Sequence, residues 1–294
     1  MVLINYGNEY NLPAVPIISQ LNHVITWIPE LQLYADTTAG VAPFGVLPFA
    51  EYGKPVVHVV NSGNALRHTP VLAPDMASVI VNTSAHIDSR GNIAGQSTTS
   101  AEGPFAIMLR QLGLFFQSGG TSRTAAAFLA NTNTPGTADF NVPPPAELVP
   151  RYAIGSNFSI GPFPDIMLGQ RFAMPSKFAM LGGSGDTLLG PLGNINVKDG
   201  DPTPCFSGHA VEDITLDPPD GRHFLSPPPD ASIKTANLSF VARWSLTGQT
   251  IAVHREVMAR FETALCSGAT RADAAKALSA IRDNYRLGVA LAPP

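Results

Sequence analysis

The sequence predicts an α+β, β-rich fold, namely an antiparallel β-sandwich of jelly-roll type with a central helical insertion and a C-terminal helical pair. The 27 Pro and 26 Gly among 294 residues indicate many short strands joined by turns of specific shape. Residues 238–247 alternate between apolar and polar side chains, which is typical of a half-buried strand. The regular strand–helix alternation of a parallel α/β sheet is missing. Together these observations favour a sandwich over a parallel sheet.

Residues 1–53 are predicted to form an extended apolar N-terminal segment. The segment contains no Lys or Arg, and its prolines exclude a long helix. Short extended stretches are expected at 14–18, 23–28 and 44–49. Because an apolar extended segment needs a surface to lie on, we expect it to wrap around its own domain or to embrace a neighbouring subunit.

Residues 54–247 are predicted to form a β-rich domain with a helical insertion near 101–130. Two stretches in the insertion carry apolar residues on one side, at 101–117 and 121–130, which favours two helices. The acidic passage 198–230 is predicted to be a loop. The strands expected in this domain are 55–60, 77–88, 151–160 and 238–247, with a hairpin turn at 89–92.

Residues 248–294 are predicted to form a helical pair that packs on the β domain. The first helix is expected from an apolar stripe that includes His254, Val257 and Phe261. Gly268 is predicted to end it as a C-cap residue. Thr270 then resembles the start of a capping box, and the second helix is expected to run to about residue 287.

The composition limits which classes of function are open. Charged residues make up 14% of the chain, against roughly 25% in an average domain. The surface is therefore either rich in neutral polar side chains or covered by neighbouring subunits. A net charge of −4 offers no footprint for nucleic acid. The start of the chain lacks a signal-peptide pattern, and no apolar run approaches the length of about 18 residues that spans a membrane.

Cys205 and Cys266 form neither a CxxC motif nor a disulfide framework. Two reduced thiols in an intracellular compartment are the expectation, and a single bridge between them is the alternative.

The strongest resemblance to a nucleophile motif is the passage around Ser184, from Gly182 to Asp186. A nucleophile elbow has the sequence Gly-x-Ser-x-Gly and lies between a strand and a helix. Here Asp186 occupies the position of the last glycine. We therefore interpret the passage as a flexible turn.

Histidine and acidic residues suggest further sites, each weaker than its structural explanation. His86 and Asp88 share one side of a predicted strand, but a metal site needs a third ligand, so we interpret them as a surface pair. His254 is predicted to be a packed residue of its helix. The acidic passage offers oxygen ligands for Ca²⁺, but their spacing is not that of a calcium loop, so we interpret them as solvated charges. That passage contains Asp199, Asp201, His209, Glu212, Asp213, Asp217, Asp220 and His223.

We therefore predict a structural, self-assembling protein, most concretely a viral capsid, coat or outer-shell protein, that is not an enzyme and has no catalytic, cofactor or metal site. Its partners would be copies of itself and other shell proteins, without a basic arm for nucleic acid. Such a protein is expected in a virion or in the host cytoplasm. One alternative is a hydrolase with dispersed catalytic residues such as Ser184, His86 or His209. The other is a carbohydrate-binding sandwich that uses surface aromatics such as Trp27, whereas Trp244 is expected in the core.

Overall fold

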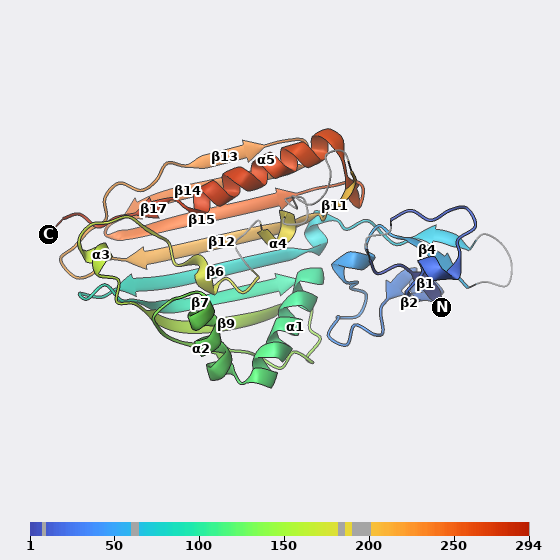
Figure 1. The fold of residues 1–294 in the computed structure, drawn as a ribbon, viewed down its shortest axis with the longest axis horizontal. Helices are drawn as coiled ribbons and strands as arrows, with labels where there is room; N and C mark the ends of the chain where they lie inside the picture. Colours follow the sequence, from blue (N-terminus) through green and yellow to red (C-terminus); the bar gives the residue numbers. More distant parts are fainter. Residues whose placement is uncertain (8–9, 60–64, 182–185, 190–200, 294) are drawn as a thin grey trace.

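A computed structural model describes residues 1–7, 10–59, 65–181, 186–189 and 201–293 of the chain. It has a small five-stranded sheet at one end and a large eight-stranded sheet that forms the rest of the molecule (Figure 1). The predicted fold class is confirmed, because the protein is β-rich, its sheets are largely antiparallel, and a few helices accompany them.

The small sheet is built from the N-terminal residues and has the strand order β3-β2-β1-β4-β5. The predicted strand at 23–28 is confirmed, whereas the stretches 14–18 and 44–49 form no strand. The predicted boundary at residue 53 falls inside this sheet, because β4 pairs with β1. Its strands are β1 (Val2–Ile4), β2 (His23–Ile28), β3 (Leu33–Ala35), β4 (Pro55–His58) and β5 (Leu66–His68). We call residues 1–68 the N-terminal unit.

The large sheet has the order β13-β14-β15-β12-β6-β7-β9-β8. Its neighbouring strands are antiparallel, except that β12 and β6 run parallel. The strands are β6 (Ser78–Ile87), β7 (Ile93–Glu102), β8 (Gly136–Asn141), β9 (Tyr152–Ile160), β12 (Gly208–Asp217), β13 (Ala231–Lys234), β14 (Leu238–Thr247) and β15 (Thr250–Ala259). Two short pairs lie outside it, β10 (Phe172–Ala173) with β17 (Gly288–Val289) and β11 (Thr203–Pro204) with β16 (Leu265–Cys266).

Helices cover one face of the large sheet. In Figure 1, α1 (Pro104–Gly119), α2 (Thr121–Asn131) and α5 (Gly268–Tyr285) lie on the side that faces the viewer. Two one-turn helices, α3 (Pro164–Met167) and α4 (Asp186–Leu189), add to the helical content. A row of buried residues runs across six strands beneath this layer: Phe240, Val257, Ala210, Val79, Ala101 and Tyr152. Among the residues that the structure describes, no helix is seen on the opposite face of the sheet in Figure 1.

The predicted helical insertion is confirmed as α1 and α2. Gly103 makes the tight connection from β7 into α1, with φ at +63°. A Cβ atom at this position would lie 1.8 Å from the carbonyl oxygen of Met76, so only glycine fits without a shift of the backbone. The sharp turn folds the helix back onto the sheet that it has just left.

The predicted C-terminal helical pair is correct in its second helix and wrong in its first. Residues 250–259 form strand β15, which pairs with both β14 and β12. Alternate side chains point inward here as well, from Ile251 to Ala259, but the charged Arg255 interrupts this apolar row and leaves a pattern that also fits a helix. Gly268 begins α5 rather than capping a preceding helix.

The predicted acidic loop at 198–230 is wrong over residues 208–217, which form strand β12 within the large sheet. Apolar side chains point inward along β12, and most of its acidic side chains point to the open face of the sheet. Glu212 points inward and is fully buried, and its ion pair with Arg255 of β15 offsets the cost of burying the charge. The acidic residues of β12 hide the alternation of apolar and polar side chains, because one of them occupies an inward position.

The two cysteines are bonded to each other, which corrects the expectation of reduced thiols. The pairing of β11 with β16 brings the Cα atoms of Cys205 and Cys266 to 5.7 Å from each other, a separation that suits a disulfide.

No helix in the described part of the chain is long and apolar enough to cross a membrane.

Candidate functional site

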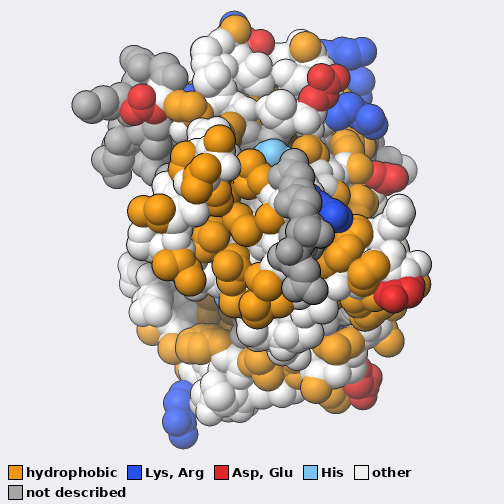
Figure 2. All heavy atoms as spheres, turned by 90° about the vertical axis from the view of Figure 1, so that its right-hand side faces the viewer, with side chains coloured by type: hydrophobic (Ala, Val, Ile, Leu, Met, Phe, Trp, Pro, Cys, Tyr) orange, Lys and Arg blue, Asp and Glu red, His pale blue; other side chains and the backbone are white. Residues whose placement is uncertain are grey.

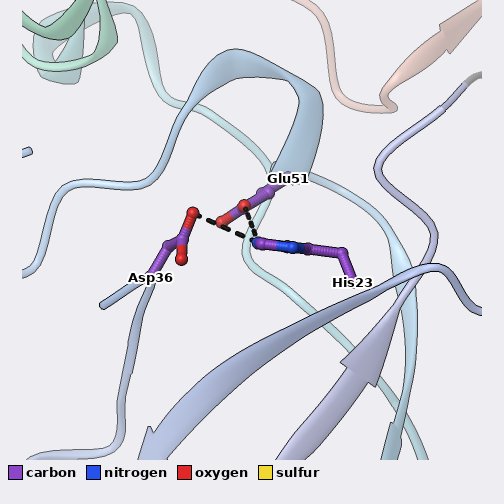
Figure 3. A group of neighbouring side chains, drawn as sticks. All are labelled: His23, Asp36 and Glu51. Atoms are coloured by element: carbon purple, nitrogen blue, oxygen red, sulfur yellow. Dashed lines mark ion pairs between the residues drawn. The ribbon is translucent and has the colours of Figure 1, made fainter. Parts of the chain in front are cut away.

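A cluster of one imidazole and two carboxyl groups lies in the N-terminal unit (Figure 3). His23 begins strand β2, and Asp36 directly follows strand β3. Because β2 and β3 are antiparallel neighbours, the chain that leaves β3 runs back along the start of β2. Glu51 ends a 3-10 helix at Phe49–Glu51, which brings its carboxyl group to the same point.

The three side chains converge on the Nε2 atom of His23. This atom lies 3.2 Å from Oδ2 of Asp36 and 3.4 Å from Oε1 of Glu51. The Asp36 side chain is 3% exposed and that of Glu51 is fully buried, whereas the His23 side chain is 21% exposed. The imidazole therefore connects a buried acidic pair to the surface of the unit.

Asp36 is held in its ionised form. Burial raises the pKa of this carboxyl group, but the hydroxyl and the backbone N–H of Thr38, together with the neighbouring Glu51 and His23 side chains, outweigh burial, so the net pKa lies below its usual range. Both Thr38 groups donate to Oδ1 of Asp36 at 2.8 Å. They fix the carboxylate and leave Oδ2 to face the imidazole.

Glu51 is held in its neutral form. Burial raises the pKa of Glu51 to about 9, and the nearby Asp36 carboxylate adds to the increase. Burial also raises the pKa of Tyr6, whose ring lies edge-on to His23 with centroids 5.4 Å apart, and both acids add to that increase. One ionised and one neutral carboxyl group therefore share the pocket at neutral pH.

Three polar atoms in this cluster make no hydrogen bond to another described residue: Nε2 of His23 and both carboxyl oxygens of Glu51. One arrangement that satisfies these atoms has the protonated Glu51 carboxyl group donate a hydrogen bond to Asp36. Another arrangement has all three residues bind a divalent cation, because one ligand atom from each residue lies within 4.8 Å of the others. A nitrogen and two oxygens would suit such an ion, with open positions for water or substrate.

The stability of the folded protein is expected to depend on the Glu51 proton. The folded pKa lies far above the ordinary value of 4.5, so the unfolded chain releases this proton first as the pH rises. The free energy of unfolding should then fall across that interval, with a slope that approaches about 1.4 kcal/mol per pH unit. In Glu51→Gln this slope should be absent, and the variant should be more stable than the wild type near neutral pH.

Urea unfolding of both proteins across this pH range measures the difference. Asn92→Ala, which removes a hydrogen bond to the surface acid Asp88, serves as a control that keeps Glu51 intact. Equal slopes for wild type and Glu51→Gln would contradict the prediction and show that Glu51 is ionised in the folded protein.

A pocket of about 420 Å³ is lined mainly by the N-terminal unit, together with Pro70 and Met76, and none of the three cluster residues is part of its wall. It neighbours the cluster in sequence, because its lining includes Tyr34, two residues before Asp36, and Tyr52, which follows Glu51. The wall also includes Trp27 and Arg67, so an apolar, aromatic lining carries a cationic group.

The sequence-predicted residues do not join this cluster. His86 is exposed on β6, and Asp88 accepts hydrogen bonds from the backbone N–H groups of Arg90 and Asn92 in the turn that follows. The surface interpretation of this pair agrees with these contacts. Ser184 lies outside the described residues. Trp244 is 8% exposed, in agreement with its expected place in the core.

Two other predicted residues meet on the open face of the large sheet. His209 contacts Glu256 at 2.7 Å, and Nδ1 of His254 contacts Asp213 at 2.8 Å. Nε2 of His254 lies 3.9 Å from Glu256, which links the two pairs into one row. All four side chains are 30–48% exposed, so solvent screens them and the row is a surface charge network. The prediction that His254 is packed in the interior of a helix is wrong, because His254 lies on β15 and points to this open face.

No family model and no curated protein matches this chain. Among solved structures, the chain is similar to a protein described as a "putative protease from Parabacteroides distasonis", with 10% sequence identity and a TM-score of 0.44. The similarity covers 98% of this chain and 39% of that protein, so the chain spans well under half the length of the structure that it resembles. At this distance the likeness carries no functional conclusion.

Proposed function

We propose that this protein is a hydrolase in which His23 is the general acid–base group and Asp36 orients it. The supporting observation is the 3.2 Å approach of the His23 imidazole to a buried carboxylate that Thr38 holds in place. An ionised acid beside one ring nitrogen fixes the tautomer and stabilises the imidazolium that forms during proton transfer. This arrangement is the base-and-orienter half of a nucleophilic site.

The roles follow from which nitrogen faces which group. We assign the ring hydrogen to Nε2, which lies 3.2 Å from Oδ2 of Asp36. Nδ1 is then the basic nitrogen and accepts the proton of the attacking group. Both cysteines of the chain are bonded to each other, so the attacking group within this chain is water or a hydroxyl. The proton then passes from His23 to the leaving amine or alkoxide of a cleaved amide or ester. The neutral Glu51 adds no second negative charge beside the imidazole, and we assign the aromatic pocket with Arg67 to the substrate.

Replacing His23 with glutamine should lower kcat/KM by about 10²–10⁴-fold, the usual contribution of a positioned acid–base group. Asp36→Asn should lower kcat with little change in KM, because it misorients the imidazole and leaves the substrate pocket intact. The assay is hydrolysis of a panel of fluorogenic peptides and p-nitrophenyl esters, with circular dichroism to establish that each variant is folded.

The matched control is His209→Gln, which removes another histidine–carboxylate contact of the same chain, on the large sheet. Full activity in His23→Gln, or an equal loss in His209→Gln, would overturn the proposal. Loss of activity in EDTA with recovery on adding a divalent cation would replace the acid–base role with a metal site made of the same residues.

A second candidate function is the self-assembling shell protein that the composition favours. The observation in its favour is the concentration of exposed large apolar side chains in the N-terminal unit. Negative-stain microscopy of concentrated protein tests it, because a shell protein should form particles of regular size, and dispersed small species would count against that role.

A further inference from the structure

The small sheet is apolar on both faces. Val2, Ile4, Ile25 and Val56 point inward and are at most 1% exposed. On the other face, Val24 of β2, Leu3 of β1 and Val57 of β4 stand in register across three neighbouring strands. An antiparallel sheet with one face in water usually presents polar side chains there, whereas strands that are apolar on both faces are covered on both.

The surroundings of this row are apolar as well. Residues 1–59 are about a fifth of the chain, yet they contain nine of the nineteen exposed large hydrophobic side chains in its described part. Figure 2, which looks onto the end of the molecule that carries the N-terminal unit, shows apolar side chains gathered over much of that end. We call these nine residues the apolar surface: Met1, Tyr6, Val15, Ile17, Ile18, Val24, Leu31, Phe44 and Val59, which are 43–81% exposed.

Few charged residues share the N-terminal unit with the apolar surface, and Arg67 of β5 is the exposed basic residue in the described part of the unit. Residues 1–53 contain no Lys or Arg. Of their acidic side chains in the described part of the chain, Asp36 and Glu51 are buried, which leaves Glu30 exposed. Binding to an anionic membrane would need a basic cluster, and a highly charged protein partner would need complementary charges. The chemistry therefore suits an uncharged, apolar protein surface.

We propose that a second copy of this chain covers the apolar surface, with the Val24–Leu3–Val57 rows of the two copies packed face to face. The row is uncharged, so like charges do not oppose its pairing with itself, and a two-fold axis lets the same patch serve both copies. A stable interface takes about 800 Å² from each partner, with an apolar core. The nine large side chains of the apolar surface, together with this row, would supply such a core.

The geometry gives this dimer a recognisable shape. The N-terminal unit lies at one end of the long axis of the molecule (Figure 1). Two copies that meet through this unit alone keep their large sheets apart, so we expect an elongated dimer. A dimer through the open face of the large sheet, or through the helices on its other face, would be compact instead.

Sedimentation equilibrium and small-angle X-ray scattering on the full chain test the proposal. The wild type should form an elongated dimer with a Kd on the order of micromolar or tighter. Val24→Glu should raise that Kd at least tenfold, because it places a charge in the apolar row. The matched control is Leu168→Glu, which adds the same charge at a 71% exposed apolar residue in the other part of the molecule and should leave the Kd unchanged.

Val24→Thr keeps the shape and the strand preference of valine, so it settles the question if Val24→Glu does not fold. It should also raise the Kd. A wild-type chain that is monomeric at about 100 μM, a compact dimer, or Val24 variants that associate like the wild type would each overturn the proposal. The test is independent of the His23 chemistry, because neighbouring residues of a strand point to opposite faces.

Discussion

Replacing Arg255 with alanine is expected to lower the free energy of unfolding by about 3–5 kcal/mol, because it leaves a buried carboxylate without its partner. Arg255 of β15 is 1% exposed and donates to Glu212 of β12 at 2.7 Å. Its Nε atom donates to Asn284 of α5 at 2.9 Å, and its guanidinium lies 4.2 Å from the ring centroid of Tyr285. The side chain therefore joins two strands of the sheet to the helix that covers them. Guanidinium chloride unfolding measures the loss.

Two variants separate the buried pair from ordinary surface charge. Arg243→Ala on the neighbouring strand removes an exposed contact with Asp230 and should cost about 1 kcal/mol or less. Joint replacement by Arg255→Met and Glu212→Leu should cost less than Arg255→Ala alone, because neither charge is then buried unpaired. Equal midpoints for Arg255→Ala and Arg243→Ala would contradict the prediction.

The same pair explains which strands the sequence revealed. Strand β14 alternates apolar and polar residues over 238–247, and those are the bounds observed. Strands β12 and β15 alternate in the same way, but each places one charged residue among its inward positions, at Glu212 and Arg255. A pattern of single residues cannot reveal that two misplaced charges neutralise each other across neighbouring strands. That information is carried by the register, which sets Glu212 opposite Arg255.

The candidate site was beyond sequence patterns for a related reason. His23, Asp36 and Glu51 are 13 and 15 residues apart along the chain and belong to a strand, a strand end and a 3-10 helix. No catalytic motif has that spacing. One signal was available, because Glu51 is a single acid in the apolar passage from Val46 to Tyr52. An acidic residue is almost never fully buried without a partner, and here the β2–β3 pairing brings the partners to Glu51.

Breaking the Cys205–Cys266 disulfide is expected to lower the free energy of unfolding by about 4 kcal/mol. In the chain-entropy model the bridge limits the unfolded ensemble, and its effect grows with the loop that it closes. This loop spans 61 residues and contains β12, β13, β14 and β15, which are half of the large sheet. Unfolding the reduced chain should therefore release far more conformational freedom than unfolding the bonded chain. Thermal and guanidinium unfolding with and without a reductant measure the difference.

The two sulfurs are almost fully buried, at 4% and 3% residue exposure, so reduction must be carried out on unfolded protein that is then refolded in reductant. The double variant Cys205→Ala/Cys266→Ala is the control, since its stability should not respond to reductant at all. The wild type should lose its advantage over this variant once it is reduced, apart from the smaller packing contribution of two buried thiols. Identical unfolding of oxidised and reduced wild type would show that the bridge does not limit the unfolded ensemble, and would contradict the prediction.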